Sequence, residues 1–302
     1  MAQINKPNQY FNTVTYTGDG TARDITTGLT TTDWVWIKRR DGTANHRLTD
    51  VVRGATNMLS SNNTNATQTD AQTVTALGTN TFSLGTDSGG YDVNTNSQTY
   101  ASWNWSAGGT APSKTYTVKV VSDSGNKYRF DDFGTSAVTL EISEGGTFRF
   151  DQADSSNSGH PLRFSTTSDG THGGGSEYTT GVTTVGTPGS AGAYTEITVA
   201  ASAPTLYYYC SVHSGMGGQA NTPTTNSFSS FDGSIQSNVS PNTTAGFSIV
   251  SYTGNGTAGA TVGHGLGTTP AMVIVKNRSE AFAWNCYHQS LGATKYILLN
   301  AT

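Results

Sequence analysis

Residues 14–22 read Val-Thr-Tyr-Thr-Gly-Asp-Gly-Thr-Ala, and residues 250–258 repeat them as Val-Ser-Tyr-Thr-Gly-Asn-Gly-Thr-Ala. Each copy is an alternating strand that runs into Gly-Asp-Gly or Gly-Asn-Gly, residues that suit the positive φ angles of a tight hairpin turn. The match continues with a shift of 236 to 238 residues, through Val35-Trp36-Ile37-Lys38 with Val273-Ile274-Val275-Lys276 and Gly54-Ala55-Thr56 with Gly292-Ala293-Thr294. This self-similarity predicts a duplicated β module.

The first copy is long enough for a complete β-sandwich, which we expect over residues 1–110. Near its end, Trp103 and Trp105 are two residues apart in a strand and therefore share one face. The second copy, residues 247–302, stops where residue 64 stands in the first. Because half a sandwich cannot bury its apolar face, we expect an incomplete copy, in a chain that is a fragment of a longer protein or the ordered part of one.

The composition favours the same class of fold. Of 302 residues, 36 are glycine, 12% are charged and 34% are hydrophobic, and the formal net charge is −4. Thr, Tyr, Val and Trp favour strands while Gly and Asn favour turns, so we expect an all-β protein built from tandem β-sandwich modules. The low charge leaves no basic stripe for phosphates, which argues against a nucleic-acid partner. No apolar run reaches the length of a membrane span, and the N-terminus lacks the apolar segment of a signal peptide.

A second type of module is predicted over residues 111–222. Strand patterns recur there between Gly-rich and Ser-rich breaks, for example at Tyr116, Val118 and Val120 and at Leu206–Cys210, which again indicates a sandwich. Residues 223–246 are rich in Ser, Thr, Asn and Pro, and we expect a linker that partly docks as an extended strand.

One group of residues has the chemistry of a metal site. Cys210, His213 and Met216 follow directly on a predicted strand, and His160 lies between two strands some fifty residues earlier. A thiolate, two imidazoles and a weak thioether form the ligand set of a type 1 copper site. The alternative is that Cys210 is a small buried hydrophobe at a strand end and that both histidines are ordinary loop residues.

The sequence around these residues resembles the cupredoxins of the plastocyanin and amicyanin type. His160-Pro161-Leu162-Arg163-Phe164 is similar to the family's His-x-x-x-Phe, and Tyr208-Tyr209-Cys210 to Met216 resembles its closing ligand loop. The resemblance implies a Greek-key sandwich with His160, Cys210, His213 and Met216 as copper ligands. Two departures are visible: Pro161 stands where the family commonly has Asn, and the longer plastocyanin loop would place Gly218 at the axial position.

Other polar groups carry weaker signals. His172, in a Gly-rich loop, is an alternative ligand or a polar loop residue. The four acidic side chains that could bind calcium lack the regular spacing of a calcium loop, and we interpret them as solvated turn carboxylates: Asp131, Asp132, Asp151 and Asp154. For Cys286 we expect only a packing role. No nucleophile elbow, zinc-protease motif or phosphate loop is present, so we expect no enzyme.

The tryptophans have two readings. The side chains of Trp34, Trp36, Trp103, Trp105 and Trp284 could stack on sugar rings, but we expect most of them to fill the sandwich core.

The repeated module resembles sandwich modules of virion proteins from marine tailed phages, including those that infect cyanobacteria. The motifs that carry this resemblance are Tyr-Thr-Gly-(Asp/Asn)-Gly-Thr, Trp-Val-Trp-Ile-Lys-Arg-Arg-Asp-Gly, Gly-Ala-Thr and Ser-Trp-Asn-Trp. It implies a phage virion structural protein, a tail or head fibre or surface appendage that contributes to host attachment. It also implies assembly in the host cytoplasm, other virion proteins as partners, a homo-oligomer with a trimer favoured, and a glycan or protein of the host cell surface as ligand.

Two alternative functions stay open. The first is a copper-binding protein for electron transfer or copper sequestration, with the central module as the working part. The second is a bacterial filament or matrix adhesin built from the same modules, against which the lack of a signal peptide counts.

Overall fold

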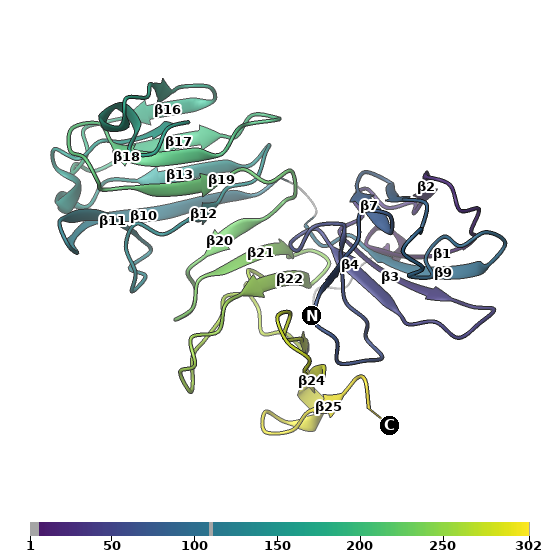
Figure 1. Ribbon diagram of the computed structural model, residues 1–302. Coiled ribbons are helices and arrows are strands. Elements are labelled where there is room, and N and C mark those ends of the chain that lie inside the picture. Colours follow the sequence, from purple (N-terminus) through teal and green to yellow (C-terminus); the bar gives the residue numbers. More distant parts are fainter. Residues whose placement is uncertain (1–5, 109–110, 302) are drawn as a thin grey trace. The chain divides into compact units, whose positions relative to one another are not determined.

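The computed structural model describes residues 6–108 and 111–301 and confirms the predicted all-β class. Within these residues the only helices are short 3-10 turns, none of which is long or apolar enough to cross a membrane. The chain forms two compact units (Figure 1). The first unit contains the described residues within 1–109, 241–249 and 266–302, and the second, here called the central unit, contains those within 110–240 and 250–265.

The first unit contains a small β-sandwich. Its larger sheet has the order β1 (Phe11–Thr17), β9 (Thr99–Trp105), β3 (Trp34–Arg39) and β4 (Arg47–Asp50). The facing sheet consists of β2 (Arg23–Thr26), β8 (Thr81–Leu84) and β7 (Val74–Leu77), and β5 (Asn57–Met58) pairs with β6 (Gln68–Thr69). Apolar side chains alternate with tryptophans along β3, and this pattern decides which face of the strand is buried. Val35 and Ile37 pack in the core with Phe82 and Leu84, and Trp34 and Trp36 lie on the opposite face.

The second copy repeats the pairing of β3 with β4, whereas its first strand lies in a different sheet from the others. It comprises β22 (Phe247–Tyr252), β23 (Met272–Val275), β24 (Asn285–His288) and β25 (Ile297–Leu298). Trp34 pairs with Asp50 in the first copy and Met272 with His288 in the second, a shift of 238 residues on both strands. The duplication therefore preserves the strand register as well as the sequence pattern.

Two side-chain contacts are duplicated with the same shift. Lys38 Nζ donates to the carbonyls of Arg39 (2.7 Å) and Gly42 (3.4 Å), and Lys276 Nζ donates to those of Asn277 (2.5 Å) and Glu280 (3.3 Å). The amide of His46 donates to Asn62 Oδ1 (3.0 Å), as the amide of Trp284 does to Asn300 Oδ1 (2.7 Å). These lysine and asparagine contacts hold the loop between the two strands and belong to the architecture of the module.

The two copies differ in how far their apolar face is covered. Val35 and Ile37 are 0% and 1% exposed, whereas their counterparts Val273 and Val275 are 37% and 39% exposed. The sheet that covers the first copy has no counterpart over β23 in the described residues.

The central unit is a sandwich of two five-stranded sheets. One sheet has the order β11 (Asn126–Phe130), β10 (Ser113–Ser122), β13 (Thr147–Asp151), β17 (Tyr194–Thr198) and β16 (Val182–Val185). The other has the order β12 (Leu140–Glu141), β19 (Gly218–Asn221), β18 (Leu206–Cys210), β14 (Leu162–Ser165) and β15 (Glu177–Tyr178). One pair in each sheet is parallel, β10 with β13 and β12 with β19. Aromatic side chains from both sheets fill the core between them.

Residues 223–246, predicted as a linker with a docked strand, contain the strands β20 (Phe228–Ser230) and β21 (Ser237–Asn242). Tyr116 Oη donates to the carbonyl of Ser229 (2.8 Å), and Phe231 is buried in the aromatic core of the central unit. A Ser-rich composition is typical of a loop. Ser229 and Ser230 are nevertheless buried, which is possible because their polar groups form hydrogen bonds inside the fold.

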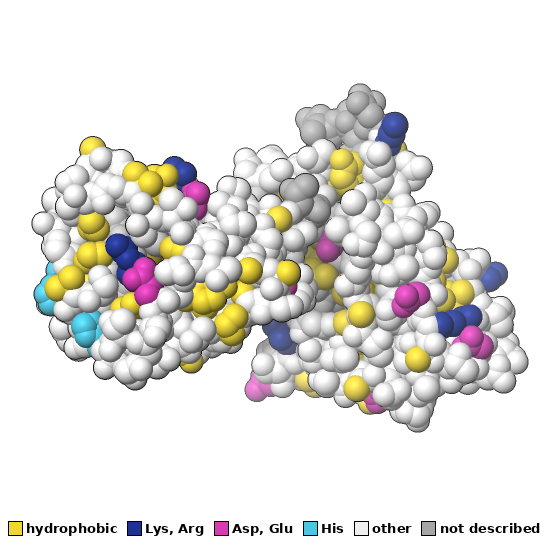
Figure 2. Space-filling view, turned by 90° about the horizontal axis from the view of Figure 1, so that it is seen from above, with side chains coloured by type: hydrophobic (Ala, Val, Ile, Leu, Met, Phe, Trp, Pro, Cys, Tyr) yellow, Lys and Arg dark blue, Asp and Glu magenta, His cyan; other side chains and the backbone are white. Residues whose placement is uncertain are grey.

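The surface agrees with the low charge of the sequence. On the face shown in Figure 2, lysine and arginine side chains form small separate groups, some of them beside acidic side chains. That face carries no continuous basic stripe of the kind that binds nucleic acid.

Candidate metal centre

Strand pairing brings the predicted ligands together. Cys210 is the last residue of β18 and pairs with Leu162 at the start of the antiparallel neighbour β14. His160 stands two residues before Leu162, and His213 lies three residues beyond Cys210 on the loop that leaves β18. Residues fifty positions apart in the chain thus meet at one end of this sheet.

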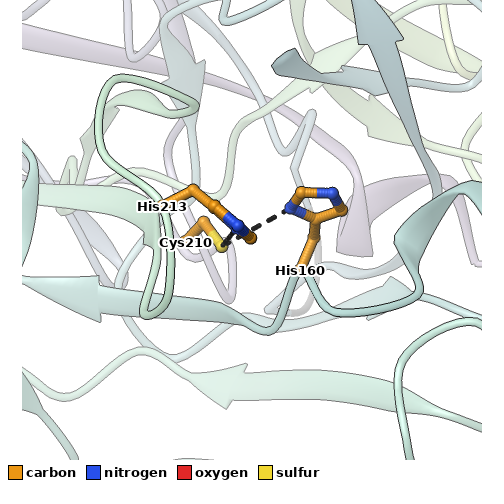
Figure 3. Close-up of side chains that lie close together, drawn as sticks. All are labelled: His160, Cys210 and His213. Carbon is orange, nitrogen blue, oxygen red and sulfur yellow. Dashed lines mark hydrogen bonds between the residues drawn. The ribbon is translucent and has the colours of Figure 1, made fainter.

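The three side chains point toward one another (Figure 3). Cys210 Sγ lies 3.9 Å from His160 Nδ1 and 3.8 Å from His213 Nδ1, and the three ligand atoms all lie within 4.8 Å of one another. The two imidazole rings have their centroids 4.6 Å apart. Cys210 is fully buried, His160 half-buried and His213 exposed, so the group lies just beneath the surface.

These spacings fit a single metal ion. With a metal–thiolate bond of about 2.3 Å, a metal–imidazole bond of about 2.0 Å and an angle of about 120°, sulfur and nitrogen lie about 3.7 Å apart. Both sulfur–nitrogen distances in the structure are close to this value. A trigonal set of two histidines and one cysteine is the equatorial ligand set of a type 1 copper site.

The backbone of His160 is fixed by several hydrogen bonds. Its carbonyl accepts from Tyr128 Oη (2.9 Å) and Gln152 Nε2 (2.8 Å), and its amide donates to the carbonyl of Asn157 (2.8 Å). Asn157 closes the 3-10 turn η2 (Ser155–Asn157), in which Asp154 Oδ1 accepts from the amide of Ser156 (2.9 Å). Buried partners of this kind hold a ligand in place before any metal arrives.

The two ligand loops are joined through the backbone. The amide of Ser211 donates to the carbonyl of Pro161 (3.1 Å), so the residues that follow His160 and Cys210 are directly linked. Pro161 has no side-chain amide that could join the two loops, so its backbone carbonyl forms the link.

Met216 is the fourth predicted ligand and is 1% exposed, in the same core cluster as Cys210. Its carbonyl accepts from the amide of Tyr128 (3.0 Å), which ties the end of the ligand loop to β11. The next residue, Gly217, has no space for a side chain, because a Cβ there would overlap the carbonyl oxygen of Tyr208.

Burial tunes the titratable groups around the site. Partial burial, and then the nearby His213, lower the pKa of His160, which favours the neutral imidazole that a metal requires. Burial, and then the neighbouring Cys210, raise the pKa of Tyr128 far above its ordinary value. Tyr128 therefore keeps its hydroxyl proton and stays a hydrogen-bond donor at neutral pH.

The weaker candidates have other contacts. His172, in η3 (Gly170–Gly173), lies outside the triad and places Nε2 3.0 Å from the carbonyl oxygen of Cys210. Asp131 and Asp132 form ion pairs with Lys114 (3.1 Å) and Lys119 (2.7 Å). Asp151 accepts from the amide of Ala153 (2.9 Å) in a local turn, as expected for a turn carboxylate. Cys286 is buried apart from these groups, in the second copy of the module.

Sequence reasoning missed the groups that support the ligands. Tyr128, Gln152 and Asn157 contact His160, and Asp169 Oδ1 accepts from the amide of Gly215 (2.9 Å) in the ligand loop. Gln152 directly follows β13 and is only 1% exposed although it is polar. This burial, which the sequence does not show, is the signal that marks Gln152 as a supporting residue.

Comparison with known proteins identifies a family but no function. No curated protein and no solved structure matches the chain. One family model matches residues 6–131 and 218–302 and passes over residues 132–217, the stretch that contains His160, Cys210, His213 and Met216. With more than half of its residues matched, the chain belongs to the family described as a domain of unknown function, DUF7483.

Proposed function

We propose that this protein is a structural component of a phage particle, a fibre or surface appendage that contributes to host attachment. The duplicated module carries the proposal, because the register of β3 with β4 and the lysine and asparagine contacts recur in the second copy. Tandem sandwiches extend by duplication, and their loops present binding residues on a rigid scaffold. The role is binding and assembly rather than catalysis.

Mass spectrometry of purified particles tests this role. We expect peptides from both copies of the module in particles separated from host debris. Their absence, with known coat proteins present, would overturn the proposal.

A second function is favoured by the triad: the central unit would bind one copper ion through His160, Cys210 and His213, with Met216 as a fourth ligand. The sulfur–nitrogen spacings, the buried thiol and the parallel pairs β10–β13 and β12–β19 support a cupredoxin-like module. Bound copper would supply one-electron chemistry or simply be stored. The exposed His213 gives the site an edge at the surface.

Absorption spectroscopy tests the copper site. Cu(II) added to the purified chain should produce an intense thiolate-to-copper band, and Cys210→Ser should abolish it while leaving the fold intact. Cys286→Ser is the matched control and should keep the band, because that thiol lies in the other unit. A parent protein without the band, or a band that survives Cys210→Ser, would exclude this site.

A further inference from the structure

A polar groove of about 690 Å³ lies on the first unit, beside the loop that joins β3 to β4. Its volume is within the range of about 300 to 1,000 Å³ that small-molecule sites occupy. The lining residues come from this loop, from the segment after β5 and from the loop before β9; those used below are Lys38, Asn45, His46, Arg47, Asn62 and Asp92.

The charged side chains of the groove are engaged within the protein. Lys38 Nζ is bound to two backbone carbonyls, a contact that the second copy repeats with Lys276. Arg47 is buried, donates to the carbonyl of Tyr91 (3.0 Å) and to Ser60 Oγ (2.7 Å), and lies over the Tyr91 ring. Asp92 Oδ1 accepts from Arg39 (3.1 Å). A charged ligand would have to compete with these contacts, the carbonyl and hydroxyl oxygens on Lys38 and Arg47 and the ion pair of Asp92 with Arg39, so the groove suits a neutral ligand.

The remaining polar atoms have defined roles. The backbone amide of His46 donates to Asn62 Oδ1 (3.0 Å), so Asn62 Nδ2 is the donor toward Asn45 Oδ1 (2.8 Å), and Asn45 Nδ2 is left as a donor. Trp36 Nε1 donates to His46 Nδ1 (2.7 Å), which places the proton of the neutral imidazole on Nε2. Burial, and then Lys38, lower the pKa of His46 and keep the ring neutral.

Apolar surface adjoins these polar groups. Trp36 and Trp103 are direct cross-strand partners, both half-buried, on the same face of the sheet as Lys38. They do not line the groove itself, but the Trp36 ring contacts the ring of His46, which does. Amide and imidazole donors, a carboxylate oxygen and indole surface together match a sugar, which offers hydroxyl groups at its edge and C–H groups on its face.

Comparison of the two copies distinguishes the residues that hold the loop from the residues that give the groove its polar and aromatic groups. The residues that hold the loop are retained in the second copy, Lys38 as Lys276 and Asn62 as Asn300. The residues that give the groove its chemistry are replaced at the positions shifted by 238: Trp36 by Ile274, Asn45 by Ala283 and His46 by Trp284. The strand pair and its loop contacts recur without them in the second copy, so the architecture of this loop does not account for their presence in the first.

We propose that this groove of the first copy binds a neutral saccharide through Asn45, His46 and Asp92. Its use in host attachment rests on the virion role proposed above, whereas sugar binding by the purified chain does not. The two can therefore fail separately.

Saturation-transfer NMR with the purified chain tests the proposal, with methyl glycosides of glucose, galactose, mannose and N-acetylglucosamine as probes at millimolar concentrations. We expect saturable binding of at least one probe. Asn45→Ala should weaken it about fivefold, since a hydrogen bond contributes about 1 kcal/mol and 1.4 kcal/mol corresponds to tenfold. His46→Phe, which keeps a ring beside Trp36 but lacks Nε2–H, should do the same.

Asn96→Ala is the matched control, an exposed asparagine of the same unit outside the groove, and it should bind as the parent does. Asn45 is exposed and its side chain is held only by Asn62 among the described residues, so Asn45→Ala keeps the test valid should His46→Phe fold poorly. No saturable binding of any probe, or parent-like binding by Asn45→Ala, would overturn the proposal. If sugar binding holds but the chain is absent from particles, only the virion role fails.

Discussion

At the scale of single residues, the ligand loop depends on positions where a side chain has no room. Gly217 lies against the carbonyl of Tyr208, and Gly170 lies against the ring of Tyr209, so that a Cβ at either place would overlap its neighbour. Both tyrosines belong to β18, the strand that ends in Cys210. The glycines let two loops approach this strand closely.

Gly217→Ala should therefore destabilise the central unit. The added methyl group must displace backbone, and we expect a loss of about 3 kcal/mol in the free energy of unfolding, measured by urea denaturation. Gly134→Ala is the control, because a Cβ there meets nothing within 4 Å. Equal effects of the two substitutions would show that the close approach to Tyr208 does not matter.

Asp33 gives the first unit a predictable dependence on pH. Its carboxylate accepts from Thr31 Oγ1 (2.8 Å) and from the amide of Gly108 (3.1 Å), but burial dominates and raises its pKa. Between the unfolded pKa of about 3.9 and the raised folded pKa, the folded state binds more protons. The contribution of Asp33 to stability is thus present below pH of about 4 and is lost as the pH rises through the folded pKa.

Asp33→Asn removes this titration. Any stability advantage of the parent over the variant should shrink, or reverse, as the pH is raised from about 4 to 7. Thermal unfolding of both proteins across this range measures the difference. Parallel pH profiles would contradict the assignment to Asp33.

At the scale of elements, the segment after the central sandwich is held by buried hydrogen bonds. Tyr116 on β10 donates to the carbonyl of Ser229 on β20, and the amide of Glu141 donates to Ser229 Oγ (2.9 Å). The ring of Tyr116 also contacts Phe231. A strand rich in serine is therefore fixed to an aromatic core through its polar groups.

Tyr116→Phe isolates the hydrogen bond, because the ring contacts remain. The carbonyl of Ser229 loses its donor in a buried setting, and we expect the unfolding free energy to fall by about 1 to 2 kcal/mol. Hydrogen exchange should show faster opening of β20 than in the parent. Tyr178→Phe, on a core-packed ring for which the described residues show no hydroxyl partner, should leave β20 unchanged.

At the scale of the whole molecule, the chain has two compact units, each with a hydrophobic core of its own. Separate cores favour separate cooperative transitions. The proposed copper ligands all belong to the central unit, whereas the saccharide groove belongs to the first. Ligands of the two sites should therefore stabilise different transitions.

Calorimetry checks this expectation. Free Cu(II) at one hundred times its dissociation constant should stabilise the transition of the central unit by about 2.7 kcal/mol and leave the other unchanged. Cys210→Ser should remove the shift. An equal shift of both transitions would indicate non-specific binding of copper.

The sequence by itself determined the all-β class and the duplication, because two-residue alternation and glycine turns are set by neighbours along the chain. It also singled out His160, Cys210 and His213 by residue type and spacing. The sequence could not show that these three side chains lie close together, because their proximity depends on the pairing of β14 with β18, about fifty residues apart in the chain.

Only the tertiary structure decided which polar groups are buried and what they contact. Gln152, Tyr128 and the serines of β20 have ordinary local sequences, and their roles follow from donors and acceptors that are distant in the chain. The tertiary structure likewise showed that Lys38 and Asn62 hold a loop in the first copy, as Lys276 and Asn300 do in the second. Local periodicity fixes the strands, but long-range packing assigns each polar side chain its partner.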